Sequence, residues 1–417
     1  MTSGTVHIVG TGLAGLSAAV KLAGSGREVV VHELARHAGG RCRSYFEPAL
    51  GLSIDNGNHL LLSGNYAALA LLKTIGSQDK LAGPKEAEFT FADLVSGESW
   101  TLRPNNGPIP WWIFSKSRRA AGTRARDYLA LRKLLRSNPK RTIEEVINCE
   151  GMAYDRVLYP VLLAALNTEP PHASASLARA ILKETLARGG RACRPLVAAE
   201  GLGAAFIDPA LAYLERKGAK VHFHHQLRGI DLAFERARSL DFSGDVVTLG
   251  AKDTVILAVP AAVATLLLPN LSTPTEFHAI VNAHFKVAPP QGLPRVVGVV
   301  NGIVEWLFAF PKRLSVTISC ADRFIEADRD ALAEEIWRDV VVLTGIEGPM
   351  PPFQIVKERR ATFAATPEQN ARRPRAATRW RNLFLAGDWT ATGLPATIEG
   401  AVRSGNEAAR LVLRGLR

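Results

Sequence analysis

The sequence predicts an α/β protein in which a Rossmann-type nucleotide-binding domain is interleaved with a mixed α+β substrate domain. A strand, a glycine-rich turn, a helix and a second strand follow one another in residues 6–33, and another glycine-rich segment follows an apolar strand in residues 382–405. The chain has 417 residues, which is more than one hydrophobic core usually supports. Because the two glycine-rich segments lie at opposite ends of the chain, we expect the nucleotide-binding domain to be assembled from both.

Residues 6–33 have the order of elements expected of a dinucleotide-binding βαβ unit. The turn after the first strand has the pattern G-x-G-x-x-G, and its predicted cofactor-binding residues are Gly10, Gly12, Leu13, Ala14 and Gly15. The first two glycines let the backbone approach a pyrophosphate, and the third lets the helix pack closely on the strand. Glu33 ends the second strand, where a carboxylate can accept hydrogen bonds from ribose hydroxyls. Its negative charge disfavours a 2′-phosphate, and hence NADP.

A second glycine pair follows shortly after Glu33. Gly39, Gly40 and Arg41 resemble the extension found in FAD enzymes of the amine oxidase and carotenoid desaturase type. In such proteins the glycines pass close to the cofactor and the arginine meets the diphosphate. The resemblance therefore predicts FAD as the cofactor.

The carboxyl-terminal segment carries a second cofactor signature. An apolar strand at residues 382–386 leads into a glycine-aspartate pair and then into a helix. The likeness to FAD oxidoreductases implies that the pair approaches the ribityl chain and diphosphate. The amino end of the helix would face the flavin, where negative charge accumulates on reduction. The predicted cofactor-binding residues are Gly387, Asp388, Thr397, Ile398 and Gly400.

Internal segments should complete the cofactor site. Residues 219–230 alternate like one strand, and the backbone near Leu227 is expected to contact the adenine. Residues 253–260 resemble the strand that returns to the nucleotide domain in these enzymes. The loop that contains Gly57 and Asn58 is expected to lie against the flavin.

These segments divide the chain into two interleaved domains. The predicted FAD-binding domain comprises residues 1–80, 195–262 and 355–417, and the predicted substrate and membrane-contact domain comprises residues 81–194 and 263–354. Apolar residues at spacings of three and four predict helices at residues 141–147, 154–166 and 175–187. Strands are predicted at residues 295–300 and 314–319.

Cysteine usage and apolar runs indicate the compartment. The four cysteines show no C-x-x-C spacing, so we expect neither a zinc site nor a disulfide framework, and a reducing cytoplasm is the expected compartment. The amino terminus lacks the basic segment of a secretory signal. The longest apolar run, residues 255–268, contains Pro260 and is too short to span a bilayer.

The net charge of +12 is unevenly distributed. Residues 116–141 contain ten Lys or Arg and one acid, and they follow the apolar segment 110–114 with its adjacent Trp111 and Trp112. Indoles beside cations suit the headgroup region of an anionic membrane, so we expect peripheral contact with the inner face of the cell membrane. Alternatively, Trp111 and Phe114 belong to the core and the basic run is a solvated helical face. Nothing resembles a nucleic-acid-binding fold, so no nucleic-acid partner is expected.

Two residues are candidate catalytic acids, and each has a structural alternative. His59 could donate a proton near neutral pH, or it could hold its loop through hydrogen bonds. Glu399 could be an acid beside the flavin, or it could serve structure alone. His222, His224 and His225 lie close together, but alternation places only two on one strand face, so we expect no metal site.

Four segments together resemble one family, the FAD-dependent hydroxysqualene dehydroxylases of bacterial hopanoid synthesis, in the superfamily of amine oxidases and phytoene desaturases. They are residues 55–62, 163–168, 358–369 and 386–400, and the likeness extends over nearly the whole chain. It implies that hydroxysqualene, a long isoprenoid alcohol, loses its allylic hydroxyl and accepts a hydride from reduced FAD, which gives squalene. An apolar tunnel would exclude water, and His59 or Glu399 would protonate the departing oxygen. The sequence does not identify the reductant of the FAD.

Two other functions remain open at this point. A desaturase of phytoene or a related polyene would use the same fold with hydride moving in the opposite direction. A non-catalytic membrane scaffold would hold FAD only as part of its structure. The nucleotide-binding motif does not determine the direction of hydride transfer.

Overall fold

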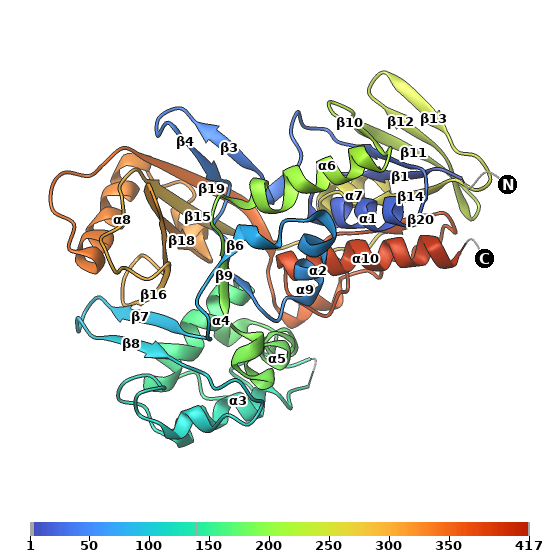
Figure 1. The fold of residues 1–417 in the computed structure, drawn as a ribbon. Coiled ribbons are helices and arrows are strands. Elements are labelled where there is room, and N and C mark those ends of the chain that lie inside the picture. Colours follow the sequence, from blue (N-terminus) through green and yellow to red (C-terminus); the bar gives the residue numbers. More distant parts are fainter. Residues whose placement is uncertain (1–3, 139, 416–417) are drawn as a thin grey trace.

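The computed structural model describes residues 4–138 and 140–415, and its fold is built around two large β-sheets (Figure 1). The first has five parallel strands in the order β10-β2-β1-β14-β20. They are β1 (Val6–Val9), β2 (Val29–His32), β10 (Lys220–His222), β14 (Thr254–Leu257) and β20 (Leu383–Leu385). Both ends of the chain and its middle therefore meet in one parallel sheet, and the predicted α/β fold class is confirmed.

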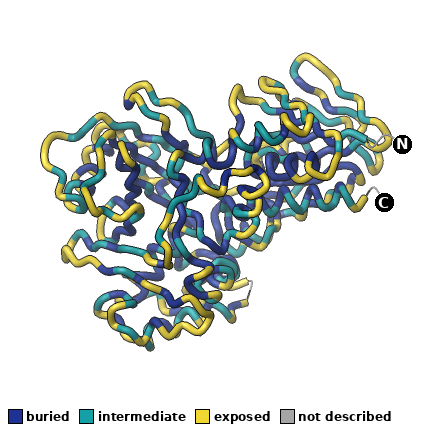
Figure 2. Tube along the Cα trace, viewed as in Figure 1, coloured by how far each residue is buried: buried dark blue, intermediate teal, exposed yellow. Residues whose placement is uncertain are grey.

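Four helices pack around this sheet: α1 (Leu13–Gly24), α2 (Tyr66–Ile75), α6 (Asp208–Arg216) and α10 (Ile398–Arg414). Helix α1 is almost wholly buried between α6 and α10 (Figure 2). Its alanines allow close contact on every side. A Cβ atom at Gly405 would lie 2.0 Å from the carbonyl oxygen of Ala14. Glycine at this position therefore lets α10 approach α1.

A three-stranded antiparallel sheet lies beside the first sheet and consists of β11 (Leu227–Ala233), β12 (Arg236–Phe242) and β13 (Asp245–Thr248). The prediction of one strand over residues 219–230 is wrong. The segment forms β10 and β11, which belong to different sheets, and His224 between them has a positive φ of 54°. Left-handed backbone at this residue ends the extended run that the alternation suggested.

The second large sheet has seven strands in the order β19-β15-β18-β17-β16-β7-β8. They are β7 (Phe89–Asp93), β8 (Ser99–Leu102), β15 (Phe277–Phe285), β16 (Val296–Val300), β17 (Trp306–Phe310), β18 (Arg313–Ile318) and β19 (Phe353–Phe363). The predicted strands at 295–300 and 314–319 are confirmed. The predicted domain boundary at residue 355 falls inside β19, which pairs with β15 along its length.

The two faces of this sheet differ in chemistry. One face is aliphatic and packs on α8 (Arg329–Thr344) through residues such as Val316, Ile336 and Trp337. The other carries a row of aromatic side chains on β7, β8 and β17, which packs against Trp112, Tyr128 and Val157. Beside the aromatic row, β15 and β18 present polar side chains: Asn282, His284, Ser315 and Thr317.

A helical region covers the aromatic face. It includes α3 (Leu129–Leu134), a π-helical turn (Tyr154–Leu158) that continues into α4 (Tyr159–Leu166), and α5 (Ala175–Glu184). The helices predicted near 154–166 and 175–187 are confirmed, whereas residues 141–147 form turns instead of a helix. Thr142 bridges to Ser174, and Ile143 and Ile147 are both buried, so tertiary contacts override the local periodicity.

Short elements connect these layers. Strands β3 (Ser44–Glu47) and β4 (Leu52–Asp55) form a hairpin, and β9 (Pro195–Ala198) pairs with β5 (Leu61–Leu62) and β6 (Leu81–Ala82). The remaining α-helices of the described residues are α7 (Ala261–Leu267) and α9 (Pro367–Ala371).

Candidate functional site

The two predicted glycine segments form one cradle at the carboxyl end of β1. Gly12 and Gly39 make an isolated parallel bridge, and the backbone N–H of Gly39 donates to the carbonyl of Thr11 at 3.0 Å. A Cβ atom built on Gly12 would meet nothing within 4 Å, so the space in front of this turn is open. Helix α1 begins at Leu13, and its free amino-terminal N–H groups suit a pyrophosphate. The structure brings together Gly10, Gly12, Leu13, Ala14, Gly15, Gly39 and Gly40.

Glu33 is held against this cradle. Its carboxylate accepts hydrogen bonds from the backbone N–H of Thr11 at 2.8 Å and from the backbone N–H of Ala35 at 2.9 Å. The Thr11 hydroxyl donates to the same carboxylate. These bonds orient a half-buried acid at the end of β2, where the sequence places a ribose ligand.

Arg41 joins the cradle to the carboxyl-terminal segment. Its guanidinium contacts the Asp388 carboxylate at 2.7 Å and also donates to the carbonyl of Ala361. The charge of Asp388 raises the pKa of Arg41 further, so the cation is permanent. The side chain of Arg41 keeps 43% of its surface exposed, so donors remain for an anionic ligand.

The loop that follows β20 is fixed by hydrogen bonds. The Gly387 N–H donates to the Ser404 hydroxyl at 2.8 Å, and the buried Arg373 guanidinium donates to the Asp388 carbonyl at 3.0 Å. At the start of α10, the Thr397 hydroxyl accepts from the Gly400 N–H at 3.0 Å. This cap leaves the amino end of a 17-residue helix well formed beside the loop.

Asn58 connects the cofactor loop to the polar face of the second sheet. Its amide nitrogen lies 3.3 Å from Asn282 Oδ1, 3.2 Å from the Val316 carbonyl and 3.2 Å from Thr317 Oγ1. A Cβ atom at neighbouring Gly57 would lie 3.3 Å from the Asn282 amide. The donors of Asn58 are therefore used within the protein, whereas its Oδ1 is buried without a hydrogen-bond partner among the described residues.

Asn282 and Thr317 were missed by the sequence prediction. Both are polar residues within strands whose neighbours are buried aliphatic residues, Val281 and Val316 among them. A buried amide at such a position needs a partner. That requirement is the signal that could have identified them.

His59 follows Asn58 and lies close enough to Arg41 to be influenced by its charge. Burial, and secondarily the positive Arg41, lower the pKa of His59 to about 4. The imidazole is therefore neutral at physiological pH in this structure. Neutral imidazole is a poor general acid for a leaving hydroxyl.

Glu399 is committed to structure. Its carboxylate accepts from the backbone N–H groups of Ala67 and Ala68 at 3.0 and 2.9 Å, at the amino end of α2, and from Arg403 at 2.7 Å. The residue is 3% exposed. These contacts favour the structural alternative over a catalytic role, because the acid stabilises a helix terminus and a half-buried cation.

Leu227 lies at the start of β11 and is buried. The segment before it is tied to β2, since the Glu33 N–H donates to the His222 carbonyl and the His225 N–H donates to the Glu33 carbonyl, both at 2.8 Å. Leu227 is thereby held in the same region as Glu33.

Histidines cluster beside this connection. His32 lies 3.2 Å from His7 and 2.9 Å from His225 between ring nitrogens, and its ring stacks on Phe242. Burial and the neighbouring imidazoles lower the pKa of His32 to about 3. His32 therefore packs as a neutral ring.

Among the described residues, one group has metal-ligand geometry, and it does not contain His222, His224 or His225. It consists of His278, Cys320 and Asp322, and the His278 Nδ1 atom already lies 2.8 Å from Asp322 Oδ2. Half-exposed acids and histidines commonly pair in this way without a metal.

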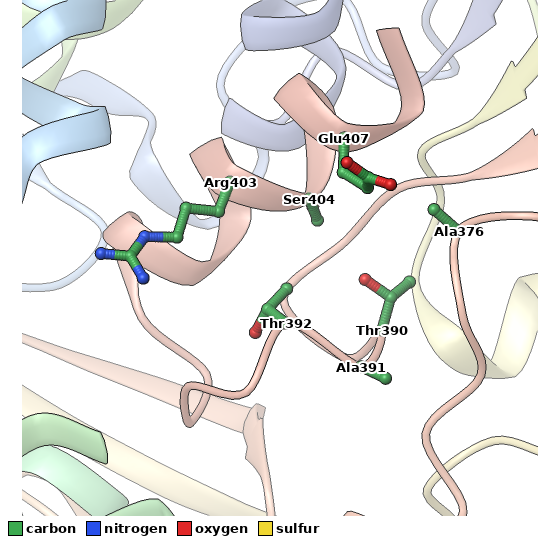
Figure 3. Close-up of a pocket in the computed structure, with 7 residues that line it drawn as sticks. All are labelled: Ala376, Thr390, Ala391, Thr392, Arg403, Ser404 and Glu407. Atoms are coloured by element: carbon green, nitrogen blue, oxygen red, sulfur yellow. The ribbon is translucent and has the colours of Figure 1, made fainter. Parts of the chain in front are cut away.

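A pocket of about 280 Å³ lies between α10 and the loop after Asp388 (Figure 3). Its lining residues are Ala376, Thr390, Ala391, Thr392, Arg403, Ser404 and Glu407. None of the predicted cofactor residues lines it, so it is distinct from the glycine cradle.

The residues of the cradle fit FAD. The open space at Gly12, the carboxylate of Glu33, the guanidinium of Arg41 and the amino end of α10 are the groups that a ribose, a diphosphate and a flavin require. They are supplied by segments far apart in the chain and meet in one region.

Comparison with known proteins agrees with this site. Residues 13–413 match the model of the flavin containing amine oxidoreductase family. The chain is 56% identical to a hydroxysqualene dehydroxylase of Rhodopseudomonas palustris, with 99% of each chain covered, and 53% identical to one of Sinorhizobium fredii, with 98% of each covered.

Solved structures show the same fold. The chain superposes on cyclohexylamine oxidase from Brevibacterium oxydans with a TM-score of 0.69 at 18% identity, with 99% of each chain covered. The corresponding values for a putrescine oxidase double mutant are 0.72 and 16%, again with 99% of each chain covered. The chain belongs to the flavin containing amine oxidoreductase family and, within it, to the group of the hydroxysqualene dehydroxylases, and its cofactor is FAD.

Proposed function

We propose that this protein reductively removes the allylic hydroxyl of hydroxysqualene to give squalene, as a step in hopanoid or other triterpenoid synthesis. The main support is the 56% identity over 99% of the chain to a protein of that name, together with a cradle that fits FAD. In the reaction the C–O bond breaks, a proton joins the departing oxygen to form water, and a hydride joins the allylic carbon. Bound reduced FAD supplies that hydride.

The aromatic face of the second sheet suits the isoprenoid. Phe91, Trp306 and Phe308 are buried there, and Asn58 and Thr317 lie on the polar strip beside them. We place the hydrocarbon chain along this face, because apolar side chains favour contact with it and keep water from a cation-like carbon. The border between apolar and polar side chains offers a place for the single hydroxyl group.

Residues 109–118 support contact with a membrane surface. Trp111, Phe114 and Ile109 expose 50%, 72% and 76% of their surfaces, and the Arg118 guanidinium lies 4.8 Å from the Trp111 ring centroid. The neighbouring Trp112 is buried in the aromatic cluster. This short segment thus exposes apolar side chains and a cation to solvent, and through Trp112 it packs against the proposed substrate region. We propose that it docks on an anionic bilayer, from which a water-insoluble substrate enters.

No helix among the described residues is long and apolar enough to cross a bilayer. Within the proposal, membrane contact is therefore peripheral and formed by this exposed segment. The inner face of the cell membrane is the proposed place of this contact.

The decisive experiment uses purified, photoreduced protein and hydroxysqualene without oxygen. We expect flavin absorbance to return to the oxidised form as squalene appears in equal amount by mass spectrometry. Persistent reduced flavin with intact substrate would contradict the proposal. If protein with oxidised FAD instead oxidises phytoene and its flavin becomes reduced, the desaturase would be established, a function named for relatives of 22–24% identity.

A further inference from the structure

Reductive loss of a hydroxyl requires a proton donor, and neither candidate from the sequence suits this task. His59 is neutral at physiological pH, and the Glu399 carboxylate is occupied by α2 and Arg403. A suitable acid must hold a proton near neutral pH and lie beside the proposed substrate region.

Glu305 meets the positional requirement. It directly precedes Trp306, a member of the buried aromatic cluster, and Trp306 pairs in register with Thr317 of β18. Thr317 in turn contacts Asn58 of the cofactor loop at 3.2 Å. The backbone of Glu305 therefore adjoins the aromatic row and the polar strip, and its carboxyl group lies near Glu169 and Tyr159, in the helical region that covers this face of the sheet.

The carboxyl group of Glu305 is fixed from one side. Its Oε2 accepts the backbone N–H of Ser319 at 2.8 Å. Ser319 is two residues beyond Thr317, a separation of about 7 Å along an extended strand. Glu305 is half-buried. Its Oε2 atom is held by this hydrogen bond, while part of the residue stays accessible.

The charged and titratable groups around Glu305 come from several elements. Glu169 follows α4 and accepts from the Tyr159 hydroxyl at 3.1 Å, while Cys320 and Arg323 follow β18. Burial raises the pKa of Glu305 to about 7; hydrogen bonds from Ser319 and the charge of Arg323 oppose this effect, and the negative Glu169 adds to it. The carboxyl group is thus poised to hold and release a proton near physiological pH.

We propose that Glu305 is the general acid that protonates the departing hydroxyl of the substrate. The inference rests on the proposed function. Glu305 gives its proton to the oxygen as the C–O bond breaks, water leaves with both electrons of that bond, and the carbon accepts the hydride. The resulting carboxylate regains a proton from solvent, so atoms and charges balance over one turnover.

The first test compares Glu305→Gln with the unchanged protein, both loaded with FAD. The amide preserves size and the Ser319 hydrogen bond but carries no acidic proton. We expect squalene formation in single turnover to fall about 10²- to 10⁴-fold, with FAD content and melting temperature retained. Glu326→Gln is the matched control, because its side chain is 82% exposed and pairs with Arg359.

A second readout does not depend on turnover. Infrared titration of the resting protein should show a protonated carboxyl band that disappears with a midpoint near pH 7 and is missing in Glu305→Gln. Glu169→Gln removes a like charge, so it should move this midpoint to lower pH while Glu305 stays in place. This variant keeps the inference testable if Glu305→Gln fails to fold.

The outcomes separate the two proposals. If folded Glu305→Gln forms squalene as fast as the unchanged protein, or if its infrared titration is the same, the role of Glu305 is overturned and the proposed function stands. Absence of squalene from the unchanged protein would overturn the proposed function and the role of Glu305 with it.

Discussion

The Arg41 guanidinium lies 2.7 Å from the Asp388 carboxylate, and this ion pair joins two cofactor segments 347 residues apart in the sequence. Asp388 is itself held through its carbonyl by Arg373. The pair thus sets the distance between the glycine cradle and the loop before α10.

Replacing Asp388 by Asn should weaken FAD retention roughly 10- to 100-fold, because a charge-assisted hydrogen bond of about 1.5–3 kcal/mol orients Arg41. Flavin absorbance after gel filtration at graded dilution measures this loss. Glu326→Gln removes an exposed ion pair and should retain FAD normally. Equal retention by the Asp388 variant would show that Arg41 is positioned without its partner.

Alanine at Gly12 should affect FAD binding, whereas alanine at Gly15 should affect the stability of the apoprotein. A Cβ atom at Gly12 meets only open space, so Gly12→Ala should fold with a free energy of unfolding within about 0.5 kcal/mol of the original but should bind little FAD. At Gly15 the Cβ atom would lie 1.9 Å from the Gly10 carbonyl oxygen, so Gly15→Ala should destabilise the apoprotein itself. Thermal melts of apoprotein and FAD titration distinguish the two; normal FAD affinity in Gly12→Ala would contradict the cradle.

Glu399→Gln should lower stability by about 1–3 kcal/mol, because Arg403 and the α2 terminus lose a buried carboxylate. The pH profile of turnover should keep its shape. Denaturant unfolding and a rate profile from pH 5 to 9 test the two parts. A displaced pH profile would return Glu399 to the list of candidate acids.

Acid should destabilise the protein through its buried histidines. Burial lowers the pKa of His284 to about 3, so the unfolded chain binds its proton first as the pH falls. The stabilising effect of the neutral ring is present above the ordinary histidine pKa of about 6.5 and is lost as the pH falls from there toward about 3. His284→Gln should remove up to about 1.4 kcal/mol per pH unit from the slope of unfolding free energy in this range. An unchanged slope in His284→Gln would contradict this account.

Membrane binding should depend on the exposed apolar side chains of residues 109–114. The double substitution of Trp111 and Phe114 by Ala should reduce co-sedimentation with vesicles of anionic phospholipid at least tenfold, since each removes exposed apolar surface. Phe234→Ala removes an aromatic ring that is even more exposed, at 94%, from the hairpin of β11 and β12, and this variant should bind normally. Equal losses in both variants would argue against a specific docking segment.

The order of strand, glycine-rich turn, helix and strand in residues 6–33 was predicted correctly because its constraints are local. A tight turn before α1 needs glycine, and the acid at the end of β2 lies at a fixed distance along the same βαβ unit. The segment 219–230 failed for the opposite reason, since the left-handed backbone at His224 has no signature in alternating polarity. Residues 141–147 failed because the partner of Thr142, Ser174, lies outside the segment.

By itself the sequence determined the α/β class, the FAD cofactor and the family, because short motifs and overall similarity carry that information. Tertiary structure decided the roles of single side chains. Glu399 and Glu305 both have apolar neighbours in the sequence. In the fold, Glu399 accepts from two helix N–H groups and an arginine, whereas Glu305 accepts from one N–H group and lies near a second acid. Proton affinity follows from these distant neighbours, which only the folded chain brings into contact.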